Sequence, residues 1–323
     1  MPTQRAQQYE STTRIDTTTE PLARELLAGL AAPSPFISPK FLYDPLGSRL
    51  FSAITELDAF YATRTEAAIV AANLDAIAAA APGCTLIDLG AGDCEKAARL
   101  FGALQPRQYV AVDISEQFLA ESLARLAERH PSLSMTGVGA DFSRSLQLPD
   151  TVQESKRLFF YPGSSIGNFS RSDALAFLRR LRGQLDAAGG LLIGIDLVKD
   201  KATLEAAYDD ALGVTAAFNL NVLRNANRIA GTDFEIADWR HRAFFDDAES
   251  RIEIYVEARR TVDFHWRDGG RSFAAGQRIH TENSHKYRLD DFDRLLQAAG
   301  FFVQHSWTDP RRWFAMVLAR PTD

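Results

Sequence analysis

A short apolar run that breaks on two glycines and continues as a helical pattern is the feature that most limits the fold of this chain. The stretch LIDLGAGDCEKAARLF occupies residues 86–101 and places Gly90 and Gly92 in the break. A strand, a glycine turn and a helix in this order are typical of a parallel α/β sheet whose turn approaches a nucleotide phosphate. This turn also carries Asp93 and Glu95, whose carboxylates would repel a phosphate. The sequence therefore indicates a cofactor without phosphate that tolerates nearby negative charge.

Short apolar segments alternate with helical patterns along much of the chain. Five segments are candidate parallel strands, at residues 85–90, 109–114, 133–138, 157–163 and 190–197. Helical patterns at 116–128 and 172–185 predict a doubly wound sheet with helices on both faces. An amphipathic helix at 289–301 and two strands around Pro310 predict a C-terminal antiparallel hairpin. This order resembles the Rossmann-like sheet of S-adenosylmethionine-dependent methyltransferases rather than the all-parallel dinucleotide-binding fold.

Composition and charge exclude several classes of function. The 323 residues, 46% of them hydrophobic, suffice for one large domain or two modest ones. The formal net charge of −6 and the lack of Lys and Arg clusters among aromatics argue against a nucleic-acid partner. We find no apolar signal segment and no stretch of the roughly 20 apolar residues that span a bilayer. We therefore expect a cytoplasmic protein that binds no membrane.

Cysteine and histidine usage gives no reason to expect a metal. Cys84 and Cys94 have no metal-ligand spacing and fit a reduced compartment. His280 and His285 have no Cys or carboxylate at ligand spacing to complete a site. The sequence predicts no metal site.

The chain between Val198 and Lys286 is much longer than a connection between a strand and its helix. It contains a helical stretch at 201–230 and strand-like segments at 241–266. We therefore predict an inserted α+β substrate-binding domain that the N-terminal segment completes. The predicted parts are a disordered segment at 1–15, the N-terminal segment at 16–61, a methyltransferase domain formed by 62–198 and 287–323, and the insert at 199–286.

Polar residues at three predicted strand ends are candidate cofactor contacts. Asp113 closes the second strand, where an acidic residue accepts hydrogen bonds from ribose hydroxyls. Asp141 and Phe142 follow the third strand, where they would meet the edge and the face of an adenine ring. The alternative is that Asp113 and Asp141 are only solvated turn residues. S-adenosylmethionine, with a sulfonium and no phosphate, is the predicted cofactor, and the methyltransferase pattern D-x-G-x-G is matched by Asp88, Gly90 and Gly92.

Four motifs together resemble the histidine-specific Nα-methyltransferase family of ergothioneine biosynthesis. They are FYATRTE at 60–66, GDCEK at 92–96, GSSIGNF at 163–169 and TENSHKY at 281–287. The resemblance covers nearly the whole chain from Ser34 onward. It implies an enzyme that uses S-adenosylmethionine to methylate the α-amino group of L-histidine, to the trimethylated betaine hercynine.

The resemblance also implies roles for individual substrate-binding residues. Asn168 and Tyr208 would hold the α-carboxylate of histidine. Glu282 and Ser284 would clamp the imidazole ring, and Tyr61 would lie on the amine side of the pocket and serve catalysis.

Further positions follow the family or depart from it. Lys96 follows the glycine turn at the family's cofactor-binding position. Tyr43 is a second candidate for catalysis on the amine side, although it equally fits a packing role. After Glu282 the chain has the sequence NSHKY where we expect VSCKF, so Asn283 stands in place of valine and His285 in place of cysteine. Ile254 occupies a position where the family frequently has methionine. These departures flank the predicted site and could tune the substrate fit.

The spacing of Glu282 and Ser284 suits an imidazole on physical grounds. Side chains alternate on an extended segment, so these two point the same way. A neutral imidazole has one N–H donor and one acceptor nitrogen, which a carboxylate and a hydroxyl can pair with respectively. A phenol or an indole cannot satisfy both. The alternative is an ordinary solvated strand face, because E-x-S alone is common.

The predicted reaction is an in-line attack of the neutral α-amino nitrogen on the sulfonium methyl group. A free α-amino group has a pKa of about 8, and both desolvation and a nearby sulfonium would favour deprotonation. Positioning would therefore do most of the catalysis. We expect a monomer. Two alternatives stay open: a methyltransferase of the same fold that acts on another amino acid or amine, and a nonenzymatic S-adenosylmethionine-binding regulator.

Overall fold

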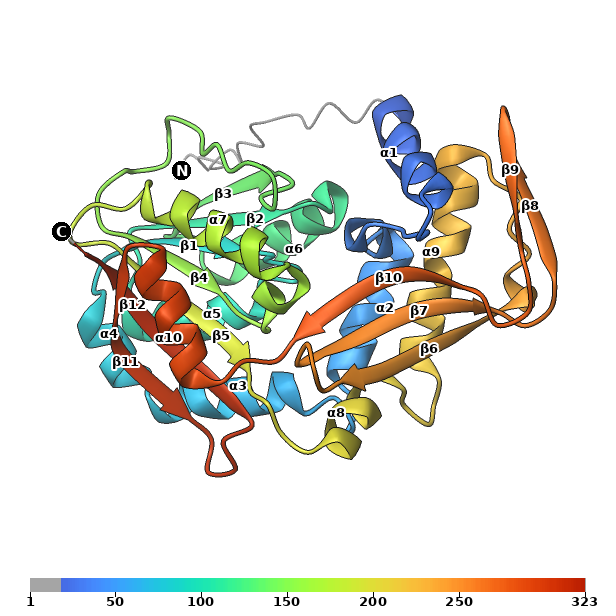
Figure 1. Cartoon of the computed structure of the whole chain (residues 1–323). Helices are drawn as coiled ribbons and strands as arrows, with labels where there is room; N and C mark the ends of the chain where they lie inside the picture. The colour runs from blue at the N-terminus through green and yellow to red at the C-terminus, as the bar shows by residue number, and fades with distance from the viewer. Residues whose placement is uncertain (1–18, 323) are drawn as a thin grey trace, which may run out of the picture.

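The computed structural model describes residues 19–322, and a seven-stranded sheet forms its larger part (Figure 1). The predicted disordered segment at 1–15 lies outside the described residues. The strand order is β11-β12-β5-β4-β1-β2-β3. The parallel strands are β1 (Thr85–Leu89), β2 (Gln108–Asp113), β3 (Ser134–Gly139), β4 (Arg157–Tyr161) and β5 (Gly190–Asp196). They match the five predicted segments.

The C-terminal hairpin completes the sheet at one edge. β12 (Phe314–Pro321) pairs antiparallel with β5 and with β11 (Phe301–Thr308). The helix α10 (Leu289–Ala298) precedes it. The predicted methyltransferase-like order of five parallel strands, a helix and an antiparallel hairpin is therefore confirmed, and the sheet is mixed.

Successive residues of the parallel strands pack on opposite faces of this sheet. Leu86 and Phe160 belong to the core on one face, and Ile87 and Phe159 to the core on the other. The first core includes side chains of α3 (Tyr61–Ala72), α4 (Leu74–Ala80), α5 (Glu95–Leu104) and α6 (Glu116–Arg129), and the second includes those of α7 (Arg171–Arg182) and α10. Because both faces are covered, the strands read as nearly continuous apolar runs.

The chain between β5 and α10 forms two helices and two small antiparallel sheets, drawn yellow to orange in Figure 1. The helices are α8 (Lys201–Tyr208) and α9 (Val214–Ala230), so a turn divides the predicted helical stretch. A short η3 (Ile236–Asp238) leads into a three-stranded sheet of β6 (Trp239–Asp246), β7 (Arg251–Ala258) and β10 (Arg278–His285). The hairpin consists of β8 (Val262–Trp266) and β9 (Gly269–Phe273).

The N-terminal elements α1 (Thr19–Ala31), η1 (Pro39–Leu42) and α2 (Pro45–Thr55) contact α9 (Figure 1). Asn221 and Asn225 of α9 fix this arrangement, because their side-chain amides donate to the Asp44 carboxylate and the Phe41 carbonyl, each at 2.7 Å. β10 in turn contacts η2 (Ser165–Asn168), which follows β4. The carboxyl ends of the parallel strands therefore face the smaller sheet.

Candidate functional site

Some of the predicted cofactor residues, Gly90, Asp113, Asp141 and Phe142, line one cavity at the carboxyl ends of the parallel strands. The cavity has a volume of ≈ 310 Å³ and shares Lys40, Tyr43 and Asp141 with a neighbouring cavity of ≈ 780 Å³. The sequence-predicted residues in its lining are Tyr43, Gly90, Asp113, Asp141, Phe142 and Asn168. Residues from the glycine turn, the second and third strand ends and the segment after β4 are thus brought together.

The glycine turn has a backbone that favours glycine. The φ angles of Gly90 and Gly92 are 72° and 54°, in the left-handed region. A Cβ atom on Gly92 would meet nothing within 4 Å, and one on Gly90 would meet only the Phe142 ring, at 3.8 Å. The turn therefore presents open backbone that a ligand can approach closely.

Asp113 is held in place by the backbone around it. Its Oδ2 accepts from the Gly92 N–H and its Oδ1 from the Ser115 N–H, both at 2.9 Å. Burial raises the pKa of Asp113, and these two bonds oppose that rise. A carboxylate has about four lone-pair positions. Asp113 therefore keeps acceptor capacity for two neighbouring hydroxyls.

Asp88 lies beneath the glycine turn rather than in the lining of the cavity. It is 1% exposed, and its Oδ2 accepts from the Tyr109 hydroxyl at 2.8 Å. Its Oδ1 is buried without a hydrogen-bond partner among residues 19–322. Burial raises the pKa of Asp88 to about 7. A cation bound at the turn would relieve part of this cost by favouring the carboxylate.

The charges around the turn fit S-adenosylmethionine better than a phosphate-bearing nucleotide. Asp88, Asp93 and Asp113 supply carboxyl groups, while Lys96 forms an ion pair with Glu66 at 2.7 Å. The other oxygen of Glu66 accepts from the Gly163 N–H at 2.6 Å, so Lys96 is linked through Glu66 to the segment after β4. Lys96 does not line the cavity. An uncompensated set of carboxyl groups suits a sulfonium and opposes a phosphate.

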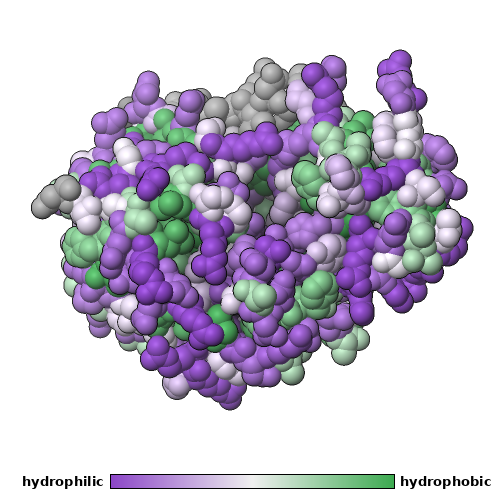
Figure 2. All heavy atoms as spheres, viewed as in Figure 1, coloured by the Kyte–Doolittle hydropathy of each residue, from purple (hydrophilic) through white to green (hydrophobic). Residues whose placement is uncertain are grey.

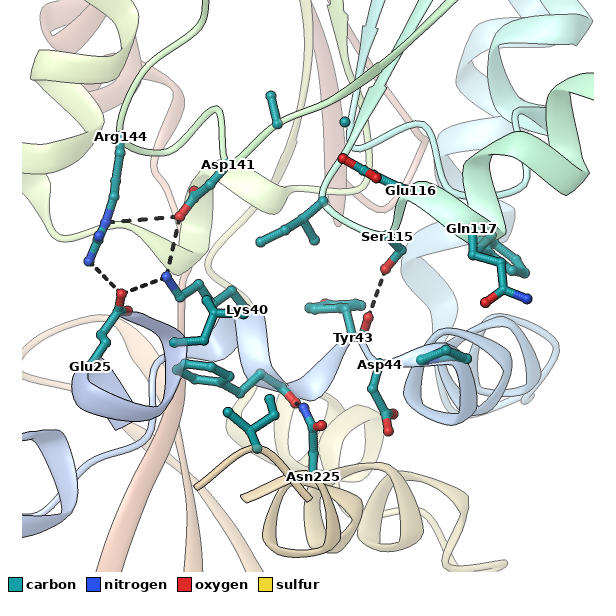
Figure 3. Close-up of a pocket in the computed structure, with 18 of the residues that line it drawn as sticks. Glu25, Lys40, Tyr43, Asp44, Ser115, Glu116, Gln117, Asp141, Arg144 and Asn225 are labelled. Atoms are coloured by element: carbon teal, nitrogen blue, oxygen red, sulfur yellow. Dashed lines mark hydrogen bonds and ion pairs between the residues drawn. The ribbon is translucent and has the colours of Figure 1, made fainter. Parts of the chain in front are cut away.

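An ion-pair cluster joins the N-terminal segment to the loop after β3 at the larger cavity (Figure 3). Lys40 of η1 donates to Glu25 of α1 at 2.7 Å and lies 3.6 Å from Asp141. Arg144 lies 3.0 Å from Glu25 and 3.9 Å from Asp141. The predicted adenine contact Asp141 is thereby tied to residues that sequence reasoning did not identify.

Glu282 and Asn168 meet on the substrate side. The Asn168 side-chain amide donates to Glu282 Oε1 at 2.8 Å. Glu282 and Ser284 are 7% and 4% exposed, which rules out an ordinary solvated strand face. Burial raises the pKa of Glu282 to about 7, opposed by Lys286 and by the Asn168 bond.

Ser284 and Tyr208 form a second hydrogen-bonded group. Their hydroxyl oxygens are 2.8 Å apart, and the Lys286 ammonium donates to each at 2.8 Å. Tyr208 comes from the last turn of α8, and Ser284 and Lys286 from β10 and the residue after it. Lys286 was not predicted, although it is buried and only two residues from Ser284.

Tyr61 lies at the start of α3 and contacts the end of β5. Its hydroxyl donates to the Asp196 carboxylate at 2.8 Å and accepts from the Lys199 ammonium at 2.6 Å. Burial and the Asp196 charge raise the pKa of Tyr61, so the phenol is neutral. Sequence reasoning missed Asp196 and Lys199, although a carboxylate at the end of a buried strand is a recognisable signal.

Tyr43 lies between the cofactor and substrate sides. Burial raises the pKa of its hydroxyl, and the nearby Glu282 and Asp113 charges raise it further. Its ring also packs edge-on against Phe51 and Phe218, with ring centroids 5.6 and 5.5 Å away. The structure therefore gives Tyr43 a packing role and a position in the site.

Two of the departures from the family pattern shape the substrate side. The His285 ring donates from Nδ1 to the Gly167 carbonyl at 2.9 Å, which ties β10 to the segment that carries Asn168. Ile254 lines a small cavity of ≈ 30 Å³ with Glu282 and Tyr208. Asn283 instead accepts from His280 Nε2 at 2.9 Å.

Neither a cluster of metal-ligating side chains nor a membrane-spanning helix is found among residues 19–322. Among residues 19–322, no group of three or more His, Cys, Asp or Glu side chains could hold a metal ion. In the same range, every helix is too short or too polar to cross a membrane.

Comparisons with known proteins agree on one family. A family model described as "Histidine-specific methyltransferase, SAM-dependent" matches residues 22–321. The chain is 38% identical over 311 residues to the histidine N-alpha-methyltransferase of Mycolicibacterium smegmatis, covering 94% of this chain and 96% of that protein. It is 36% identical over 304 residues to the Mycobacterium tuberculosis protein of the same name, covering 92% and 94%. Ergothioneine biosynthesis protein 1 of Neurospora crassa is 33% identical over 293 residues, which are 86% of this chain and 32% of that protein.

Proposed function

Because this chain belongs to the histidine-specific, S-adenosylmethionine-dependent methyltransferases, we propose that it adds three methyl groups to the α-amino nitrogen of L-histidine and forms the betaine. S-adenosylmethionine-dependent Nα-methylation of histidine is its activity, and ergothioneine biosynthesis is the pathway that such a product serves. The observation that most supports the substrate is the buried pair of Glu282 and Ser284.

The cofactor-side residues have separate tasks in this proposal. Asp113 accepts from the ribose hydroxyls, Asp141 and Phe142 hold the adenine, and the open backbone of the glycine turn lets the cofactor approach. When bound, S-adenosylmethionine would supply a methyl group on a sulfonium sulfur: a neutral amine nitrogen can attack the methyl carbon in line, with the carbon–sulfur bond breaking and S-adenosylhomocysteine leaving. The carboxyl groups of the buried Asp88 and the half-buried Asp113 favour a cationic ligand at this place.

The substrate-side residues orient histidine for that attack. Glu282 accepts the ring N–H and Ser284 donates to the other ring nitrogen. Asn168 and Tyr208 bind the α-carboxylate, and Tyr61 receives an amine N–H. These roles require Asn168 to leave Glu282 when histidine enters, because the two side chains bond each other in the described structure.

We propose that residues 199–286 and the N-terminal segment at 16–61 form the substrate domain, and that the site lies in the cleft between it and the large sheet. The contacts of α1, η1 and α2 with α9 support this grouping. All proposed site residues come from one chain, so we propose a monomeric enzyme. We also propose a cytoplasmic location, which the free thiols of Cys84 and Cys94 fit.

The number of methyl groups is tested by mass spectrometry of the products over time. With excess S-adenosylmethionine, mono- and dimethylhistidine should appear and then give way to the trimethylated product. A reaction that stops at one or two methyl groups would contradict the betaine as the product.

Histidine binding should strengthen as pH rises through the pKa of Glu282, about 7. Below that pH the carboxyl group is protonated and accepts the ring N–H only through a neutral oxygen, which is a weaker hydrogen bond than the one the carboxylate makes above it. The imidazole of free histidine also titrates, near pH 6.5, and contributes in the same direction. Calorimetric titration of the S-adenosylhomocysteine complex with histidine should show both steps. Glu282→Gln, which does not titrate, should retain only the ligand's own step, and an unchanged profile would contradict the assignment.

Gly167→Ala should disturb the site because β10 approaches η2 closely. A Cβ atom on Gly167 would lie 2.8 Å from the His285 carbonyl oxygen and 3.1 Å from its nitrogen, both of them backbone atoms. The added methyl group would push η2 away from β10 and move Asn168, which is the next residue. We expect this movement to lower kcat/KM for histidine about tenfold or more. Gly102→Ala in α5 is the matched control, because its Cβ would meet nothing within 4 Å. Equal kcat/KM values for the two variants would contradict this role of Gly167.

A further inference from the structure

A buried carboxylate at the end of β5 lies between two lysines beneath the substrate side of the site. The side chains of Asp196, Lys199 and Lys286 are 3%, 4% and 0% exposed. Lys286 Nζ lies 2.8 Å from Asp196 Oδ2, and Lys199 Nζ bonds Asp196 Oδ1. The proposed reaction does not itself require this pair of buried lysines.

Lys286 uses all three of its N–H groups. It donates to Asp196, to the Tyr208 hydroxyl and to Ser284 Oγ, each at 2.8 Å. An ammonium group donates and never accepts. Both hydroxyl oxygens are therefore acceptors toward Lys286. The 2.8 Å bond between them uses one of the two hydroxyl protons and leaves the other for a different acceptor, and both protons become available when that bond opens.

Lys199 has a different effect on Tyr61, because the Tyr61 proton is used within the cluster of Asp196 and its two lysines. It donates to Asp196, to the Leu197 carbonyl at 2.6 Å and to the Tyr61 hydroxyl at 2.6 Å. Because Tyr61 accepts from Lys199, its proton goes to Asp196, 2.8 Å away. Tyr61 thus keeps one lone pair and no proton for a further partner.

The two lysines differ in how firmly they hold their charge. Burial disfavours the Lys286 ammonium, but Asp196 outweighs this effect and the pKa of Lys286 is raised. Burial lowers the pKa of Lys199 to about 8 in spite of the same carboxylate. Lys286 therefore stays protonated to a higher pH than Lys199.

We infer that Lys286 is a positioning residue that makes Ser284 and Tyr208 hydrogen-bond donors toward the substrate, once histidine has replaced the bond between the two hydroxyls. The inference rests on the proposed function. A donor at Ser284 fits the ring nitrogen that lacks a proton, a donor at Tyr208 fits the α-carboxylate, and an acceptor at Tyr61 fits an amine N–H. Without Lys286, the Ser284 proton can turn inward, and the pocket no longer demands an acceptor nitrogen in the ring.

Two ring analogues of histidine separate this effect from a general loss of structure. Pyrrolylalanine isomers keep a ring N–H and replace the acceptor nitrogen by C–H. Thiazolylalanine keeps an acceptor nitrogen and replaces the N–H by sulfur. In the native protein, kcat/KM should favour histidine over both analogues, because each leaves one buried group unpaired.

Lys286→Met should lower the preference for histidine over pyrrolylalanine about tenfold, because the unpaired Ser284 proton no longer penalises the pyrrole. Because loss of Lys286 also raises the pKa of Glu282, both ratios are measured well above that pKa, where Glu282 stays ionised. The preference over thiazolylalanine, which depends on Glu282, should then stay within about twofold. Ser284→Ala should also lower the preference for histidine over pyrrolylalanine. The double variant Ser284→Ala, Lys286→Met should show the same preference as Ser284→Ala alone. Lys199→Met is the matched control: it removes the other buried lysine and should leave both ratios unchanged.

Binding of S-adenosylhomocysteine by each variant shows that it is folded. Should Lys286→Met fail to fold, Lys286→Gln gives the same test, because a neutral amide can also accept from Ser284 and should lower the pyrrole ratio. Equal changes in both ratios, or no change in either, would overturn the inference. If the native protein does not methylate histidine at all, the proposed function fails instead, so the two failures are distinguishable.

Discussion

Asp113→Ala is expected to weaken binding of S-adenosylhomocysteine at least about tenfold, or about 1.4 kcal/mol. The substitution removes the acceptor for two ribose hydroxyls. It also frees the Gly92 and Ser115 N–H groups, which hold the carboxylate at 2.9 Å in the present structure. Isothermal calorimetry with the purified protein measures the loss directly.

Asp93→Ala is the matched control for this prediction. It removes the same charge from the same turn, but Asp93 is exposed and does not line the cavity. Its effect on the dissociation constant should stay within about twofold, as expected for a screened surface charge. If Asp113→Ala also stays within about twofold, Asp113 is not the ribose acceptor.

Glu282→Ala should lower kcat/KM for histidine on the order of 10²-fold, or about 3 kcal/mol, while S-adenosylhomocysteine binding is retained. The reason is that a buried carboxylate which accepts the ring N–H is lost, whereas the cofactor cavity is lined by other residues. The same change removes the group that penalises a ring without a matching N–H. Activity toward phenylalanine or tryptophan should therefore fall less than activity toward histidine, or rise.

Glu282→Gln gives this prediction its control. The amide keeps the size of the side chain and an acceptor oxygen, so a smaller loss of kcat/KM for histidine is expected than with alanine. Steady-state kinetics for each amino acid give the ratios. Equal proportional losses for histidine and the aromatic amino acids would mean that Glu282 supports the structure or the methyl transfer in general, and does not read the ring.

Much of the fold could be predicted because its elements leave local patterns in the sequence. β1, β2, β4 and β5 are buried on both faces and so appear as apolar runs, and period-two alternation predicts Glu282 and Ser284 on one side of β10. The division between α8 and α9 was missed, because the turn before Gly213 is short and the apolar residues continue through it.

The groups that support the site could not be predicted in the same way. Lys286 meets Tyr208 across 78 positions in the chain, and Lys199 meets Tyr61 across 138. A lysine in a sequence usually marks a solvated surface, and only tertiary contacts show that these two are buried on one carboxylate. The same holds for Glu25, which joins Lys40 and Arg144 only in the folded chain.

The most direct test of the substrate is a competition assay. Purified protein is incubated with S-adenosylmethionine and an equimolar mixture of the twenty amino acids, and mass spectrometry identifies the methylated products. Histidine should be the amino acid that gains methyl groups, on its α-amino nitrogen, while the others remain unmodified. Methylation of another amino acid in preference to histidine, or of several without distinction, would contradict the reading of the imidazole ring by Glu282 and Ser284.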